Sequence, residues 1–203
     1  MSEETINPTA KNTISADYLS SERQSAGRRD QGSAKSFPRS PINRWHNLIA
    51  TNTAVAVGTR LNGTKAEIYV NGMRVQLRRG LICCPDVVIV QGTPTFADQN
   101  SDLLLDPTIV VEVVSSATNP LDKTQKLESF LAIESIKECL LVKADELRVE
   151  HYARQNAKQW IYRIYDERDN VISLESIHCK LSLAEIYAQV NVKQAELSSK
   201  AVN

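Results

Sequence analysis

The spacing of hydrophobic residues predicts an amphipathic helix where the patterned part of the chain begins. Between residues 44 and 57, apolar or small side chains recur every three or four positions, as on one face of a helix. His46 lies on this face, and Gly58 is a plausible end for the helix. Residues 1–41 show no sustained period and are rich in small and polar residues, so we expect a disordered or loosely attached segment with at most a short helix near residues 16–24.

Several short strands are predicted next. Residues 66–70 and 73–77 have strand character, and the Asn71-Gly72 pair between them is typical of a two-residue hairpin turn. The run PDVVIV at residues 85–90 predicts a buried strand. After a polar loop, residues 108–114 predict a second buried strand.

The remaining pattern predicts a helix, a buried strand, an antiparallel meander and a final helix. Asn119 suits the N-cap of a helix that starts at Pro120 and runs to about Ser135. A buried strand follows at residues 139–142, and a capping box at Ser182–Glu185 opens the last helix toward Val190. The strands of the expected meander are residues 147–152, 159–165 and 171–174.

This order of elements predicts the α/β or α+β class, with a mixed central sheet flanked by helices and an added antiparallel meander. The chain has 203 residues, which is enough for one domain with a hydrophobic core. We expect this domain to span residues 42–192 and a frayed tail to follow over residues 193–203.

Composition narrows the class of protein. Hydrophobic residues make up 42% of the chain and charged residues 24%, as in a soluble globular protein. Lys and Arg together number 24, as do Asp and Glu, so the balanced charge argues against a dedicated nucleic-acid coat protein but allows a local basic groove. We expect a cytoplasmic protein without membrane contact, because the N-terminus lacks an apolar signal region and no run of about 18 apolar residues occurs. The cysteines are expected to be buried free thiols: Cys83, Cys84, Cys139 and Cys179.

Glu112 interrupts a strand that is otherwise suited to burial. Its neighbours in IVVEVV are branched aliphatic residues, and a buried carboxylate is costly unless it is paired, protonated or bound to a metal. Asp86 opens the other buried run, and the two carboxylates come together if the two runs are neighbouring strands. Two carboxylates with waters suit Mg²⁺ or Mn²⁺, which polarise a phosphodiester and lower the pKa of an attacking water. The pattern therefore predicts a metal site at Asp86 and Glu112.

Lys126 is the candidate cation of this site. It falls inside the apolar arc of the helix predicted to begin at Pro120, where a lysine needs a partner or a function. Lys123 falls on the same arc but in the first turn, nearer to solvent, and ranks lower. Asp122 lies four residues before Lys126, the better orientation for a helical ion pair, although helix capping is the commoner role for it. We predict that Lys126 holds the attacking water or the phosphoryl group.

Each of these residues also has a purely structural interpretation. Asp86 could cap a turn, Glu112 could meet a cation or water at a strand end, and Lys126 could extend past the apolar face into solvent. A histidine on a helix face, such as His46, is more often packed or exposed than a ligand. His151 alternates with a valine in its strand and is interpreted as facing solvent.

Taken together, these motifs resemble a known family. In chain order, the segments PDVVIV, TIVVEVVSSAT, DKTQKLESF, ECLLV and LRVEHYAR resemble the Uma-two family of restriction-endonuclease-like proteins, within the PD-(D/E)XK nuclease superfamily. The resemblance runs from about Trp45 to Tyr187, and its most specific part is the PD…EVxS…DxxxK spacing. It implies a restriction-endonuclease-like fold and a metal-dependent nuclease.

The resemblance also implies roles for single residues. Asp86 corresponds to the aspartate of the PD element, and Glu112 to the acidic residue of the next strand. The superfamily usually has lysine two residues after that acid, where this chain has Val114. In this family the lysine comes from the following helix, where Lys126 stands. His46 matches a histidine that is common at the start of the family's long helix.

The chain departs from the family at one acidic position. Relatives usually carry a glutamate in an N-terminal element resembling EYxxGE, whereas the corresponding stretch GRRDQGSAKSF has Arg28 in its place, with Asp30 as the nearest acid. The helix position that often holds tyrosine is Phe130. The loss of an acid would weaken metal binding.

Three functions remain open for these residues. The leading hypothesis is a Mg²⁺- or Mn²⁺-dependent endonuclease that hydrolyses phosphodiester bonds in DNA, with Asp86 and Glu112 as metal ligands and Lys126 assisting. The second is a nucleic-acid-binding or regulatory module that kept the fold and lost the chemistry. The third is a metal-independent enzyme using two carboxylates as acid and base, which leaves Lys126 unexplained. Because nuclease relatives often act as dimers, a homodimer is also expected.

Overall fold

The computed structural model describes residues 43–77, 81–116 and 120–192, apart from the side chain of Asp122. The helices are α2 (Arg44–Leu61), α3 (Pro120–Leu131) and α4 (Leu183–Ile186), with the 3-10 helix η2 (Glu175–Ile177). The strands are β1 (Ala66–Val70), β2 (Arg74–Gln76), β3 (Ile82–Cys83), β4 (Val87–Gln91), β5 (Leu103–Leu104), β6 (Ile109–Val114), β7 (Glu138–Lys143), β8 (Val149–Arg154), β9 (Trp160–Tyr165), β10 (Val171–Leu174) and β11 (Cys179–Ser182). Among these residues, no helix is long and apolar enough to cross a membrane.

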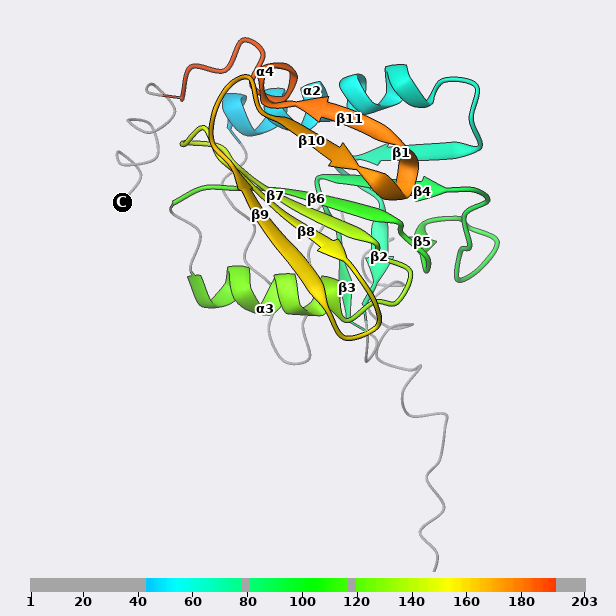
Figure 1. Ribbon diagram of the computed structural model, residues 1–203. Helices are drawn as coiled ribbons and strands as arrows, with labels where there is room; N and C mark the ends of the chain where they lie inside the picture. Colours follow the sequence, from blue (N-terminus) through cyan, green and yellow to red (C-terminus); the bar gives the residue numbers. More distant parts are fainter. Residues whose placement is uncertain (1–42, 78–80, 117–119, 193–203) are drawn as a thin grey trace, which may run out of the picture.

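A six-stranded mixed sheet organises these elements (Figure 1). Its strand order is β1-β4-β6-β7-β8-β9. β6 and β7 are parallel, and α3 forms the crossover between them, whereas all other neighbours in this sheet are antiparallel. β6 lies inside the sheet and every one of its residues is buried, which explains its nearly continuous hydrophobic sequence. The predicted mixed central sheet flanked by helices is confirmed.

Two separate cores cover the two faces of this sheet. On one face lie α2, α4 and the β10–β11 hairpin, and on the other lie α3 and a small sheet of order β3-β2-β5. The side chains of β6 divide between these cores: Val111 and Val113 pack under α2, whereas Val110 and Val114 pack with Phe130 of α3. The residue between Val111 and Val113 therefore faces α3.

Two predictions in the N-terminal half are wrong. α2 continues through Gly58 to Leu61, because burial of Leu61 outweighs the roughly 1 kcal/mol cost of glycine in a helix. The Asn71-Gly72 hairpin is absent from this stretch, since β1 pairs with β4 while β2 joins β3 and β5 in the small sheet. Asn71 has φ 52° and its N–H donates to the carbonyl of Asp86, so it directs the chain away from β1. Asn71-Gly72 therefore makes a turn between sheets.

The C-terminal half follows the predicted order with one change of partner. β7, β8 and β9 form an antiparallel ribbon, but β10 leaves it and pairs with β11, a strand that the sequence pattern did not predict. The capping box at Ser182–Glu185 is confirmed, although α4 ends at Ile186 and α3 at Leu131, each earlier than predicted. All four cysteines are buried free thiols, as predicted.

Some predictions concern segments outside the described residues and stay predictions. The segment 1–41 with its short helix, the N-cap at Asn119 and the tail over 193–203 lie outside the described residues. The boundaries of a single domain over 42–192 likewise remain a prediction.

Candidate functional site

Asp86 is held in place at the start of β4 by two different elements. Its Oδ1 lies 2.9 Å from Nε2 of His46, and its Oδ2 accepts a 2.8 Å hydrogen bond from the N–H of Val113. His46 lies in the first turn of α2, where the side chain of Asn43 caps the helix and accepts from the N–H of His46. Asp86 is 6% exposed and His46 is 4% exposed. These contacts fix the orientation of the Asp86 carboxylate, so His46 acts on the site through Asp86.

Glu112 and Lys126 form an ion pair between the buried strand and the helix that follows it. Nζ of Lys126 lies 3.0 Å from Oε1 of Glu112. Glu112 is 7% exposed, and the side chain of Lys126 is 16% exposed. Lys126 also lies 6.0 Å from the ring centroid of Phe130, a neighbour that favours its positive charge. The structure therefore brings together the strand carboxylate and the core-facing lysine.

The register of the sheet places Asp86 beside Glu112. β4 and β6 are antiparallel with Val87 opposite Val111, so the next step along both strands puts Asp86 opposite Glu112. The hydrogen bond from Val113 to the side chain of Asp86 lies at this same end of the strands. The three residues predicted for the site thus come from two neighbouring strands and the crossover helix, and their chemical roles stay predictions.

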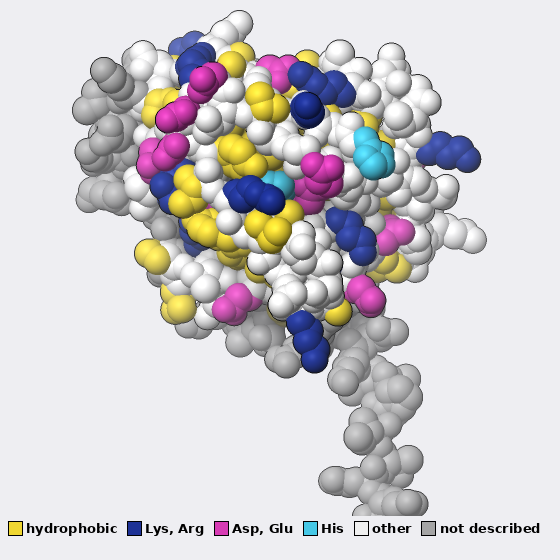
Figure 2. Space-filling view, viewed as in Figure 1, with side chains coloured by type: hydrophobic (Ala, Val, Ile, Leu, Met, Phe, Trp, Pro, Cys, Tyr) yellow, Lys and Arg dark blue, Asp and Glu magenta, His cyan; other side chains and the backbone are white. Residues whose placement is uncertain are grey.

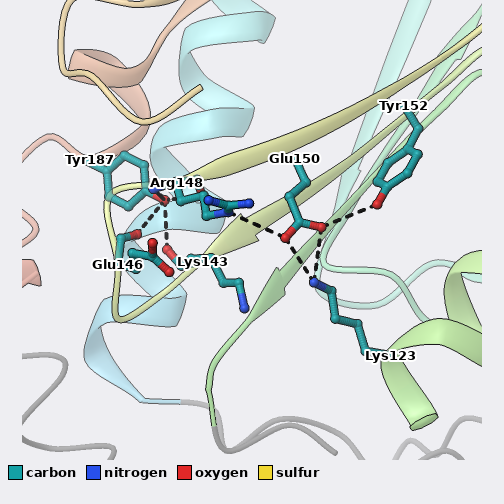
Figure 3. A network of polar contacts seen from close by, with 7 residues as sticks. All are labelled: Lys123, Lys143, Glu146, Arg148, Glu150, Tyr152 and Tyr187. Carbon is teal, nitrogen blue, oxygen red and sulfur yellow. Dashed lines mark hydrogen bonds and ion pairs between the residues drawn. The ribbon is translucent and has the colours of Figure 1, made fainter. Parts of the chain in front are cut away.

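A second acid–lysine pair lies on the same face of the sheet. Nζ of Lys123 donates to both carboxylate oxygens of Glu150 at 3.1 Å, and Nε of Arg148 lies 3.6 Å from Oε1 of Glu150. The hydroxyl of Tyr152 approaches the other oxygen at 3.4 Å. Figure 3 shows these side chains converging on Glu150 from α3, from β8 and from the turn that precedes β8. Glu150 is therefore the centre of a small cationic cluster.

The two acid–lysine pairs are related by the geometry of the sheet and the helix. Glu112, Leu141 and Glu150 lie opposite one another on β6, β7 and β8, so the two carboxylates share a face and are two strands, about 10 Å, apart. Lys123 and Lys126 are three residues apart on α3 and lie on one side of it. Lys123 is the more exposed of the two lysines, as predicted, whereas its partner Glu150 was not predicted. The shared helical arc of the two lysines was the available signal.

Tyr187 fixes the turn that joins β7 to β8. Its buried hydroxyl lies within hydrogen-bonding distance of three carbonyl oxygens, at 2.8 Å from Lys143, 3.1 Å from Glu146 and 2.9 Å from Arg148. The N–H of Arg148 donates to the same hydroxyl at 3.2 Å (Figure 3). Burial raises the pKa of Tyr187, so the hydroxyl keeps the single proton that the three carbonyls share. The turn is thereby held rigidly beside the cationic cluster.

The interpretation of His151 as facing solvent is wrong. His151 is 1% exposed, and its Nε2 lies 2.8 Å from Oε2 of Glu138. The other oxygen of Glu138 accepts from the N–H of Ser176 in η2 at 2.8 Å. Burial alone would raise the pKa of Glu138, but the hydrogen bonds from His151 and Ser176 outweigh it and hold the pKa below its usual value. Val149 and His151 are two residues apart and share one face of β8, so the alternation itself places His151 beside a buried valine. η2 and the β10–β11 hairpin cover this face.

At the candidate site, the described residues provide two carboxylates that could bind a cation, those of Asp86 and Glu112. Within residues 43–77, 81–116 and 120–192, no group of three or more His, Cys, Asp or Glu side chains is arranged to hold a metal ion. Arg28 and Asp30 lie outside these ranges, and the side chain of Asp122 is not described. An ionised carboxylate has about four lone-pair sites, so the contacts of Asp86 leave it acceptor capacity. Oxygen donors of this kind fit Mg²⁺ or Mn²⁺, which often take one or two carboxylates and keep several waters.

Comparison with protein families gives a match that spans most of the chain. The sequence model of the Uma2 family, described as "Putative restriction endonuclease", matches residues 31–185. The chain is 27% identical to the uncharacterized protein sll1609 of Synechocystis sp. over 154 residues, which cover 75% of this chain and 87% of that protein. It is 24% identical to the uncharacterized protein slr1290 of the same organism over 144 residues, covering 70% of this chain and 74% of the relative.

A solved structure has the same fold. The crystal structure of a "putative nuclease belonging to DUF820" from Anabaena variabilis aligns with a TM-score of 0.66 at 15% sequence identity. The alignment covers 80% of this chain and 91% of that one. At this identity the similarity concerns the fold, and it confirms the predicted restriction-endonuclease-like class.

Proposed function

This chain belongs to the Uma2 family, described as "Putative restriction endonuclease", and we propose that it is an endonuclease that hydrolyses phosphodiester bonds in DNA with the help of Mg²⁺ or Mn²⁺. The observation that carries this proposal is the 3.0 Å contact between Lys126 and Glu112 beside Asp86. It puts a mostly buried ammonium group next to the carboxylate of a strand and the one that precedes the neighbouring strand, an arrangement that suits a metal ion and a phosphoryl group together.

Each protein group has a definite task in this proposal. Asp86 and Glu112 would hold the ion, which would polarise the phosphodiester and lower the pKa of a water bound to it. Lys126 places a positive charge where negative charge develops on the phosphoryl oxygens and orients the water that attacks. His46 and the N–H of Val113 hold the carboxylate of Asp86 in one orientation.

A second candidate is a nucleic-acid-binding or regulatory module that has the nuclease fold and little or no activity. Two observations favour it. Both oxygens of Asp86 already accept contacts from His46 and Val113, and the described part of the chain supplies no third ligand to the pair. This candidate predicts that Glu112→Ala leaves nucleic-acid binding unchanged.

We also propose that the protein is a cytoplasmic homodimer. Cutting both strands of a duplex is simplest with two sites related by symmetry. The edge strand β9 exposes Tyr162 and Ile164, and Figure 2 shows hydrophobic side chains gathered over this side of the molecule with Lys and Arg among them. A surface of this kind supports association of two copies.

The test combines metal binding with DNA cleavage. Mn²⁺ is titrated calorimetrically into the wild type, Glu112→Ala and the control Glu128→Ala, which removes an exposed carboxylate from α3. The same proteins are then assayed for nicking of supercoiled plasmid. Loss of both metal binding and nicking in Glu112→Ala alone supports the nuclease. A wild type that neither binds Mn²⁺ nor nicks the plasmid favours the binding module.

A further inference from the structure

The face of the sheet that carries the candidate site has further basic side chains toward the β7–β8 turn. One row beyond Glu112 and Glu150, Lys143 lies opposite Val114 of β6, and its N–H donates to the carbonyl of Arg148 at 3.0 Å. Lys143 and Arg148 therefore follow the row of carboxylates along the sheet. Figure 3 shows the amine of Lys143 pointing to the same side of the sheet as Lys123.

The carboxylates near these cations are occupied to different degrees. Lys123, Lys143 and Arg148 supply three cations, and the carboxylates of this region are Glu150, the exposed Glu146 and the buried Asp145, which accepts from the N–H and the hydroxyl of Ser116. Glu150 is buried and contacts Lys123 and Arg148 at the same time. A buried carboxylate that binds two cations holds them in place without neutralising both, so the cluster keeps affinity for an anion.

The side chains of Lys123 and Arg148 are partly exposed. The side chain of Lys123 is 22% exposed and that of Arg148 is 27% exposed. Tyr187 fixes the backbone of Arg148 by accepting from its N–H, so one of the cations sits on a rigid turn. Positioned cations that are partly exposed are suited to phosphate, and a guanidinium group can bind two phosphate oxygens at once.

We infer that Lys123, Lys143 and Arg148 form a phosphate-binding surface for the backbone of a nucleic acid, next to the candidate catalytic site. Lys123 lies one helical turn from Lys126, and the two lysines face carboxylates two strands apart. A polymer with successive phosphates reaches both positions at once, whereas a single phosphate ion reaches only one. Glu150 is the positioning residue of this surface. The inference rests on the proposed function only for the identity of the bound polymer as a nucleic acid.

The test measures binding separately from cleavage. Anisotropy of a fluorescein-labelled DNA duplex is recorded with the full chain in EDTA, over a series of NaCl concentrations. Lys123→Gln and Arg148→Gln should each weaken binding by about three- to tenfold and lower the salt slope by about one. Lys123→Arg, which keeps the charge, should restore the slope. Lys158→Gln removes an exposed lysine from the opposite end of β8 and should leave the slope unchanged.

Each outcome decides the inference. Unchanged salt slopes in Lys123→Gln and Arg148→Gln, or a wild type that does not bind the duplex, would overturn it. Inorganic phosphate that displaces the duplex at constant ionic strength and low concentration would also overturn it, because it would indicate a single-phosphate pocket. Reduced slopes in a protein that fails to nick plasmid with Mn²⁺ would support the phosphate surface and reject the nuclease.

Discussion

The stabilising interaction between Glu112 and Lys126 can be tested by unfolding measurements alone, without any substrate. The perturbation is a double-mutant cycle of Glu112→Gln, Lys126→Met and the combination of both. Each single substitution leaves one charged group without its partner in a buried environment, whereas the double variant removes both charges. The cycle therefore isolates the interaction between the two side chains.

The structure sets the expected size of the effect. At 3.0 Å and an effective dielectric constant of about 20, the Coulomb attraction is about 5.5 kcal/mol before desolvation is subtracted. Loss of one partner from a fully buried pair costs about 3–5 kcal/mol. Because the side chain of Lys126 is 16% exposed and can turn partly toward water, we expect about 2–4 kcal/mol for each single variant. The double variant should be less destabilised than the sum of the singles by about 1–3 kcal/mol.

The assay is urea unfolding at pH 7, followed by circular dichroism and analysed for the free energy of unfolding. The control combines Glu112→Gln with Lys123→Met, because Lys123 pairs with Glu150, and its two effects should add within about 0.5 kcal/mol. If the two effects in the Glu112–Lys126 cycle also added within about 0.5 kcal/mol, the proposed stabilising interaction would be refuted, because the two charges would not stabilise each other. The expected coupling in only the first cycle would support it.

Three further predictions follow from single contacts. The pKa of Glu138 is lowered in the folded state, so the stability that its carboxylate contributes is present above the ordinary pKa of 4.5 and is lost as pH falls through the lower folded pKa. The free energy of unfolding should therefore fall less steeply with acidification in Glu138→Gln than in the wild type, and equal falls in the urea midpoints of the two proteins would contradict this. Tyr187→Phe leaves buried carbonyls of the β7–β8 turn without their donor and should cost about 1–3 kcal/mol in urea unfolding, whereas an unchanged midpoint would show that water replaces the hydroxyl. Gly58→Ala should raise the free energy of unfolding by about 0.5–1 kcal/mol, because an added Cβ lies 3.5 Å from Ile68 in ordinary contact; a lower thermal midpoint would show that Ile68 cannot accommodate it.

Much of the fold could be predicted because its signals are local. The apolar runs at β4, β6 and β7 are nearly continuous, since both faces of the sheet are covered, and this kept them recognisable without knowledge of their neighbours. The capping box at Ser182–Glu185 depends on residues three apart and was predicted at its actual position. The core-facing position of Lys126 followed from helical spacing, whereas its ion pair with Glu112 was not predicted, because helical spacing indicates only Asp122 as a partner.

Tertiary structure alone decided which strands pair and which faces are covered. β2 joins β3 and β5 instead of folding back on β1, and β10 pairs with β11 instead of β9, because backbone hydrogen bonds in a sheet do not depend on the side-chain pattern of one strand. The same holds for the Glu150–Lys123 pair and for the burial of His151 against Glu138. A strand pattern shows that alternate residues share a face. Whether that face meets solvent, a helix or a second sheet depends on segments far away in the sequence.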